Sequence, residues 1–383
     1  MKDTLDRIYH TTRSIRNGLI LILIVALVFI LKTIASLILP LILAMLLTLI
    51  VLPLIHWLKD KGWPQVVIVP LIAVVTLGLV FLIFSIFLNA LTEIVGQQEQ
   101  LLIMLEKKVN RIMDMVNSRY AVDTTGEEAF NWLMGEFDME RVSALIRTAA
   151  TGLGSFGQSF FLFMLYYIFL LGGTSTYREY VDFVAQDDHR LMLTISSVQN
   201  SISTYMVIKS AISLSTAIIV FVICSIMHIE FAFLWGILTF FLNFVPSIGS
   251  IIATMPPVIM AFIQYDTFTP MIVTFSLLTA TQMTIGNFLD PKIMGDRLRL
   301  NTVTVVFGLV FWGYIWGIPG TLLSVPMMVA VKLMLEQSET LGILARVMGY
   351  PDRESRKSTR RSIKRHDRRS AIQPTEEDTI REE

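Results

Sequence analysis

The sequence contains little charge and a single cysteine. Only 16% of its 383 residues are charged, whereas 54% are hydrophobic, and soluble domains usually carry about 25% charged residues. Cys224 is the one cysteine, so the chain cannot form an intramolecular disulfide. The sequence also lacks a His-Glu-x-x-His zinc motif and a Walker-type phosphate loop. These absences argue against a disulfide-stapled domain, a metalloprotease and an ATP-driven pump.

One glycine pattern, at 152–157, matches the dinucleotide-binding spacing Gly-x-Gly-x-x-Gly. That pattern indicates a nucleotide site only between a strand and a helix, and here no predicted strand precedes it and an apolar span follows. We interpret these glycines as a flexible, closely packed entry into the span. The chain is therefore expected not to be an enzyme and to bind no cofactor and no metal.

Long apolar runs take the place of the missing charge. Residues 18–31, 66–88 and 271–281 reach or approach the length that crosses about 30 Å of hydrocarbon as a helix. The runs are continuous, whereas membrane β-strands alternate apolar and polar residues. We do not expect the first run to be a cleaved signal peptide, because no small-residue cleavage site follows it. The sequence predicts an all-α polytopic membrane protein.

Polar and apolar stretches divide the chain into seven predicted parts. These are a basic cytoplasmic N-terminus (1–17), N-terminal membrane spans (18–88), an extracytoplasmic amphipathic helical region (89–150), a membrane span (151–171), a cytoplasmic amphipathic helix (172–203), a transport core (204–340) and a charged cytoplasmic tail (341–383). The tail is predicted to be disordered. When membrane crossings are counted along the chain, the basic residues of the tail and the short basic loops fall on the same side of the membrane. Positive residues collect on the cytoplasmic side, so both termini are predicted to be cytoplasmic.

A heptad stripe occupies residues 91–116. Its members recur in steps of four and three: Leu91, Val95, Gln98, Leu102, Leu105, Val109, Ile112 and Val116. Such a stripe packs either against neighbouring helices of the same chain or against another subunit. Because it is shorter than four heptads, the pattern leaves both alternatives open.

Two long apolar segments, 231–264 and 302–335, are interrupted near their middle. The interruptions contain Asn243, Pro246 and Gly249 in the first segment and Gly317, Pro319 and Gly320 in the second. Proline removes a backbone donor and glycine allows unusual backbone angles, so each segment is predicted to be a broken hairpin. When membrane crossings are counted from the cytoplasmic N-terminus, the first hairpin begins outside and the second begins inside. The two hairpins therefore have opposite orientations, which predicts an inverted repeat.

An interrupted helix is tolerated at membrane depth only where protein or a water-filled cavity surrounds it. In secondary transporters, inverted repeats with broken helices place the substrate site near the middle of the membrane. The freed helix ends there present N–H groups to anionic or polar atoms and carbonyls to cations. The residues of the two interruptions are therefore predicted to line a solute pathway; the alternative is two kinked hairpins without a site.

Polar residues mark two further helices of the predicted core. Thr279, Gln282, Gly286 and Asp290 recur along one helical face, with Asn287 adjacent. They contact either a solute or neighbouring helices, and Asp290 is also placed to cap or anchor the cytoplasmic end. A second stripe begins at Lys209 and continues with Ser213 and Thr216. Lys209 is expected to snorkel to the cytoplasm; a role in ion binding or gating is the alternative.

Three ordered motifs, at 243–249, 286–295 and 311–326, resemble the autoinducer-2 exporter family of bacterial permeases, and the similarity extends over most of 15–340. The resemblance implies about eight membrane segments with re-entrant hairpins. It also implies export of the quorum-sensing signal autoinducer-2 in some members and sodium–proton exchange in others. A homo-oligomer, expected to be a pentamer, is implied as well.

One position departs from the family pattern. Several members carry a glutamate just before the Gly-Asn pair that is Gly286–Asn287 here, whereas this chain has Ile285. A buried acid there would be the natural carrier of a cation or proton, and without it Asp290 is the nearest acid. The predicted function is export of a small polar signal molecule across the bacterial cytoplasmic membrane. A sodium/proton antiporter and a non-transporting oligomeric scaffold are the alternatives. The expected partners are a solute or ion, membrane lipid and copies of the chain, with no nucleic acid.

Overall fold

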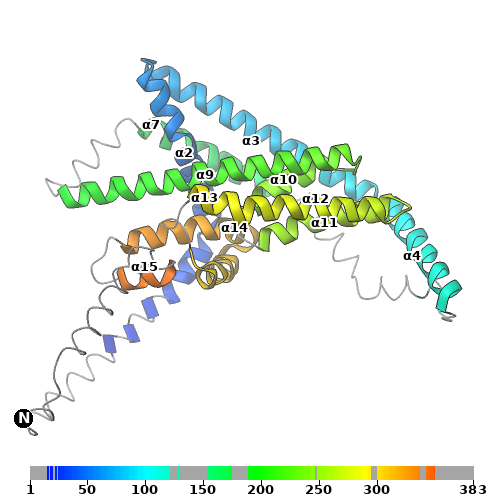
Figure 1. Cartoon of the computed structure of the whole chain (residues 1–383). Helices are drawn as coiled ribbons and strands as arrows, with labels where there is room; N and C mark the ends of the chain where they lie inside the picture. Colours follow the sequence, from blue (N-terminus) through cyan, green and yellow to red (C-terminus); the bar gives the residue numbers. More distant parts are fainter. Residues whose placement is uncertain are drawn as a thin grey trace, which may run out of the picture.

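The computed structural model describes residues 15–16, 18–19, 22–23, 25–120, 128, 153–174, 189–245, 248–294, 300–336 and 342–349. Within this part of the chain all regular elements are helices, and one isolated bridge pairs Leu300 with Gly349 (Figure 1). The predicted all-α fold is confirmed. Pro246 and the tail from 350 onward lie outside the described residues.

The labelled helices, in chain order, are α2 (Ala35–Asp60), α3 (Gln65–Gly96), α4 (Gln98–Tyr120), α7 (Leu153–Gly173), α9 (His189–Ile226), α10 (Ala232–Leu242), α11 (Ile248–Gln264), α12 (Thr269–Thr284), the π-helix η1 (Ile285–Leu289), α13 (Asp290–Met294), α14 (Thr302–Glu336) and α15 (Gly342–Met348). Residues 25–33 are also helical and end at Ile34, directly before α2. This interruption at Ile34 divides the N-terminal apolar region into two helical segments.

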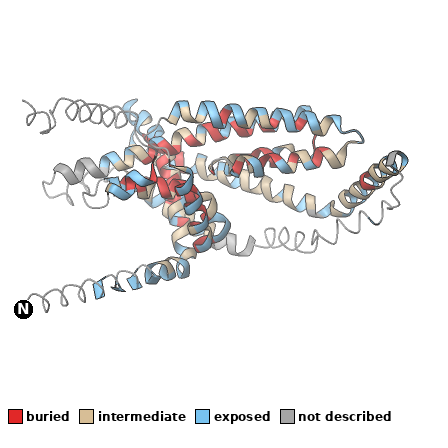
Figure 2. Cartoon of the chain, turned by 60° about the horizontal axis from the view of Figure 1, so that its bottom comes forward, coloured by how far each residue is buried: buried red, intermediate tan, exposed pale blue. Residues whose placement is uncertain are grey.

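Five stretches of helix in the described residues are long and apolar enough to cross a membrane. They are Ala35–Asp60, Gln65–Ile94, Ser196–Ile226, Thr269–Met294 and Thr302–Glu336. Many of their large apolar residues are exposed, and Figure 2 shows exposed residues in pale blue beside buried and intermediate ones along the helices. Because lipid solvates such faces, we conclude that the chain is a multi-pass membrane protein. The total of eight segments stays a prediction.

The first broken segment forms a pair of helices, α10 and α11, that pack together beside α9. Gly249, in the first turn of α11, lies directly on the end of α10. A Cβ atom at Gly249 would stand 1.8 Å from the carbonyl oxygen of Leu242. The close approach of the two helices therefore requires a residue without a side chain.

The second broken segment, α14, reverses at Gly317. This residue has φ 64° and ψ −143°, which are not helical angles. A Cβ atom at Gly308 would lie 2.5 Å from Cγ of Met328, although an uninterrupted helix would separate two residues this far apart in sequence by about 30 Å. The two arms of α14 therefore pack against each other, and the predicted break is confirmed. The second hairpin shows the same close approach as the first. A Cβ atom at Gly320 would lie 2.1 Å from the carbonyl oxygen of Trp312.

A buried lysine joins α4 to the end of α11. The Nζ atom of Lys108 donates to the carbonyl oxygens of Tyr265 at 2.7 Å and Asp266 at 2.8 Å. Its ammonium also lies 4.9 Å from the ring centre of Phe268 and 5.3 Å from that of Phe262. Burial lowers the pKa of Lys108, and the neighbouring Arg111 lowers it further, whereas Asp266 raises it. Val109 of the heptad stripe is buried within the single chain, so this part of the stripe packs on the chain's own helices.

Replacing Lys108 with methionine is expected to lower the free energy of unfolding by about 1–3 kcal/mol, because two carbonyls lose a charged donor. The matched control is Lys107→Met, which alters an exposed lysine of the same helix and is expected to change stability by under about 0.5 kcal/mol. Denaturant unfolding in detergent measures both variants. Equal stabilities would show that Lys108 does not hold α4 in place.

Candidate functional site

Three residues of α9 form a buried polar stripe. Lys209, Ser213 and Thr216, which we call the α9 polar stripe, follow one another at intervals of four and three residues and so share one face of the helix. Lys209 is 2% exposed, and Ser213 and Thr216 are fully buried. The sequence predicted this stripe. Because polar groups are costly in an apolar core unless they have partners, the elements that cover the stripe define the candidate site.

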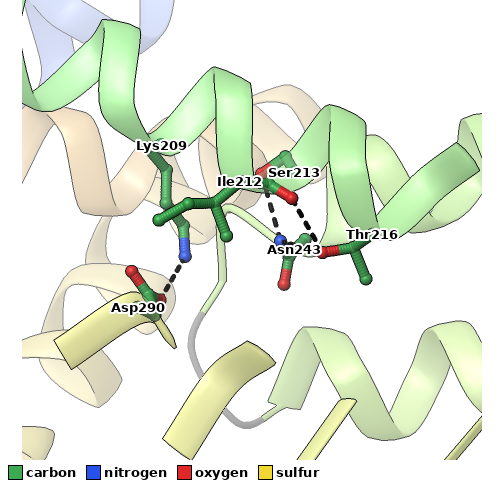
Figure 3. A network of polar contacts seen from close by, with 6 residues as sticks. All are labelled: Lys209, Ile212, Ser213, Thr216, Asn243 and Asp290. Atoms are coloured by element: carbon green, nitrogen blue, oxygen red, sulfur yellow. Dashed lines mark hydrogen bonds and ion pairs between the residues drawn. The ribbon is translucent and has the colours of Figure 1, made fainter. Parts of the chain in front are cut away.

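Asn243 covers one end of the stripe. It directly follows α10, at the start of the first interruption, and its Nδ2 atom donates to Oγ of Ser213 at 3.2 Å and to Oγ1 of Thr216 at 3.4 Å. Thr216 in turn donates to the carbonyl oxygen of Ile212 (Figure 3). The first predicted interruption therefore contacts α9 through the amide side chain of Asn243.

Asp290 covers the other end. Its Oδ2 atom lies 2.8 Å from Nζ of Lys209, and the two side chains are 20% and 3% exposed (Figure 3). The expectation that Lys209 snorkels to the surface is wrong. Its ammonium turns inward because a carboxylate from a segment 81 residues away lies within hydrogen-bonding distance, and a buried pair of opposite charges stabilises both members.

A widened helical turn explains why Asp290 faces α9. Thr274, Leu278 and Ile285 are the buried residues of this span, and regular α-spacing would next bring Phe288 or Leu289 inward, although both are exposed. The π-helix η1 adds one residue to the turn, and the backbone N–H of Asp290 bonds to the carbonyl of Ile285, five residues earlier. Asp290 thereby takes the inward place.

Pro291 is the signal for this turn that the sequence analysis missed. Proline has no N–H, and its ring crowds the carbonyl of the residue four positions earlier, which is Asn287. A widened turn directly before Pro291 relieves that crowding. The expectation that polar residues spaced by three and four share one face assumed regular α-geometry throughout, and η1 interrupts it.

The remaining predicted site residues lie elsewhere. Gln282 is partly buried and Asn287 exposed, and neither side chain makes a described hydrogen bond to the α9 polar stripe. Gly317 and Pro319 are exposed at the reversal of α14, whereas Gly249 and Gly320 are buried between the arms of their hairpins. The structure thus places Asn243 and Asp290 at two points of the α9 polar stripe, but it shows no described contact between the stripe and the tip of the second hairpin.

The two hairpins share an apolar cluster instead. Val245, in the first interruption, is buried in the same cluster as Trp312 and Trp316 of α14. The two indole rings lie 4.8 Å apart between centres, and Nε1 of Trp316 donates to the carbonyl oxygen of Leu31 at 3.1 Å. The cluster extends over α2, α9 and α14, so it connects both hairpins to the N-terminal helices.

The chain is similar in sequence to one protein family and to several transport proteins. The family model described as AI-2E family transporter matches residues 19–340. The "AI-2 transport protein TqsA" of Escherichia coli strain K12 is 29% identical over 289 residues, which cover 76% of this chain and 82% of that protein. The "Putative transport protein YhhT" of the same strain is 26% identical over 304 residues, which cover 79% of this chain and 84% of that protein.

Proposed function

Because the chain belongs to the AI-2E transporter family, we propose that it is a secondary transporter or facilitator that exports a small polar signal molecule, similar to autoinducer-2, across the bacterial cytoplasmic membrane. One observation carries this proposal. The first helix interruption and the carboxylate after η1 meet on one buried polar stripe of a membrane-spanning helix. Ionisable residues enclosed among membrane helices are functional-site candidates by default, and Lys209 of this stripe pairs with a second one, Asp290.

The polar groups suit a neutral, hydroxyl-rich solute. The amide of Asn243 donates to the hydroxyl of Ser213 at 3.2 Å and to that of Thr216 at 3.4 Å, which are long distances for hydrogen bonds. Such bonds can be exchanged for bonds to solute hydroxyls at little cost. The E. coli relative is named an AI-2 transport protein, which supports autoinducer-2 as the first cargo to test.

The same proposal extends to the architecture in the membrane. The α10–α11 pair and the two arms of α14 act as re-entrant hairpins of an inverted repeat, with Pro246, Gly249, Gly317, Pro319 and Gly320 allowing the reversals. The two hairpins have one contact in common, which supports this proposal. In each, a glycine of the second arm packs directly against a backbone carbonyl of the first arm. We further propose that both termini are cytoplasmic and that the chain works as a homo-oligomer in contact with membrane lipid.

Proteoliposomes test the function directly. The protein is expected to accelerate autoinducer-2 flux over protein-free vesicles, and Asn243→Ala is expected to lower that flux by about tenfold, because loss of the amide is equivalent to roughly 1.4 kcal/mol. Asn89→Ala, at an exposed asparagine of α3, serves as the matched control and should retain full flux.

Two results of this experiment would favour the alternatives. Sodium-triggered proton movement, detected by a pH-sensitive dye in the same vesicles, would indicate an antiporter. Equal flux from vesicles with and without protein, for autoinducer-2 and for sodium and protons, would leave the non-transporting scaffold.

A further inference from the structure

Asp290 holds a special position among the acidic residues that the structure describes. The other described aspartates and glutamates lie near helix ends, in α4, in turns or at the exposed position 128, whereas Asp290, the first residue of α13, pairs with Lys209 near the middle of α9. A carboxylate enclosed by membrane helices is the ordinary binding group for a monovalent cation or a proton. Asp290 is therefore the described residue at which a coupling cation would bind.

That position already holds a cation. The ammonium of Lys209 lies 2.8 Å from Oδ2 of Asp290, and its side chain is almost completely buried. Tyr205, one turn before Lys209 on α9, is buried and carries a phenol, which is an uncharged group near pH 7. The exposed Lys292 belongs to the same short helix as Asp290. Within the part of the chain that the structure describes, Lys209 is thus the buried positive charge paired with this carboxylate.

We propose that Lys209 is a tethered counter-cation: its ammonium takes the place at Asp290 that a sodium ion would otherwise fill, so that transport by this chain does not depend on sodium. The inference rests on the proposed function, because it names the coupling requirement of that same site. It also distinguishes the exporter from the sodium/proton antiporter on the basis of one observed ion pair.

Electrostatics gives the expected size of the effect. A sodium ion bound to Oδ1, the second oxygen of Asp290, would lie about 5 Å from the ammonium of Lys209. At an effective dielectric constant of about 20, repulsion at that distance weakens sodium binding on the order of 100-fold. Oδ1 is enclosed and accepts no hydrogen bond from the described residues. Within the same residues, no three His, Cys, Asp or Glu side chains gather into a second cation site.

Sodium binding to the purified protein tests this inference without any measurement of flux. Binding of radioactive sodium is measured in detergent at pH 8, where protons compete least. Wild type is expected to show no saturable binding in the millimolar range, whereas Lys209→Met, which keeps the apolar stem and removes the charge, is expected to bind at least tenfold more tightly. The double variant Lys209→Met/Asp290→Asn should lose that binding, and Lys209→Arg, which restores a cation, should behave like wild type.

Two outcomes would overturn the inference. One is saturable sodium binding by wild type that Asp290→Asn abolishes. The other is a folded Lys209→Met protein, judged by size-exclusion chromatography, that binds sodium no better than wild type. If Lys209→Met aggregates, Lys209→Gln takes its place under the same criteria. Absence of autoinducer-2 flux would reject the proposed cargo but would leave these binding results unchanged, so the two failures are distinguishable.

Discussion

Replacing Gly249 or Gly320 with alanine is expected to reduce transport to less than about one-tenth of the wild-type rate. The added Cβ atom would stand 1.8 Å from the carbonyl oxygen of Leu242 at the first position and 2.1 Å from that of Trp312 at the second. Both obstacles are backbone atoms, so no side-chain rotation relieves them. Ordinary contact requires more than about 3 Å, and the second arm of each hairpin must therefore move away from the first.

The same variants are expected to lose about 3 kcal/mol of unfolding free energy, at the upper end of the range for overpacking. Gly78→Ala is the matched control, because a Cβ atom at Gly78 meets nothing within 4 Å and alanine favours the helix by about 1 kcal/mol. Denaturant unfolding and vesicle flux are measured on all three proteins. Wild-type behaviour of both Gly249→Ala and Gly320→Ala would show that the arms do not pack as closely as described.

Removing one member of the Lys209–Asp290 pair is expected to be the most destabilising change of a single charge in the described chain. Lys209→Met or Asp290→Leu alone should lower the free energy of unfolding by about 3–5 kcal/mol, because each leaves a buried charge without its partner. The double variant Lys209→Met/Asp290→Leu should recover most of that loss, since neither charge remains. The pair is buried enough, at 3% and 20% exposure, for solvent screening to be weak.

A double-mutant cycle in sodium-free buffer measures the coupling between the two residues. Lys292→Met provides the control, because it removes an exposed lysine two residues from Asp290 and should change stability by under about 0.5 kcal/mol. Additive losses in the double variant would show that the two charges do not stabilise each other. Potassium is used in place of sodium so that sodium cannot refill the vacated position.

The hairpins could be predicted from sequence because their causes are local. Proline and glycine change the backbone where they stand, so the interruptions after α10 and at Gly317 lie where the sequence placed them. The α9 polar stripe was equally accessible, since helical periodicity alone brings Lys209, Ser213 and Thr216 to one face. These features required no knowledge of tertiary contacts.

The partner of Lys209 could not be predicted from the α9 polar stripe, because it depends on one distant residue and on one local change of helix type. Asp290 follows Lys209 by 81 residues, and its inward direction depends on η1, which shifts the helical register by one residue. Snorkelling was the favourable alternative for a lysine without a known partner. The position of the second hairpin could not be predicted either. The count of membrane crossings gives the orientation of a segment, but it does not say whether Gly317 and Pro319 approach Asn243.

The length of α9 has a mechanical consequence. Its 38 residues extend about 57 Å, nearly twice the hydrocarbon thickness of about 30 Å, and they include neither proline nor glycine. The helix is therefore a stiff rod with Lys209 about 30 Å from its first residue. A tilt of roughly 10° about Lys209 carries that end by about 5 Å. A force on the N-terminal end of α9 would therefore change the geometry of the Lys209–Asp290 ion pair, because the helix between them is rigid.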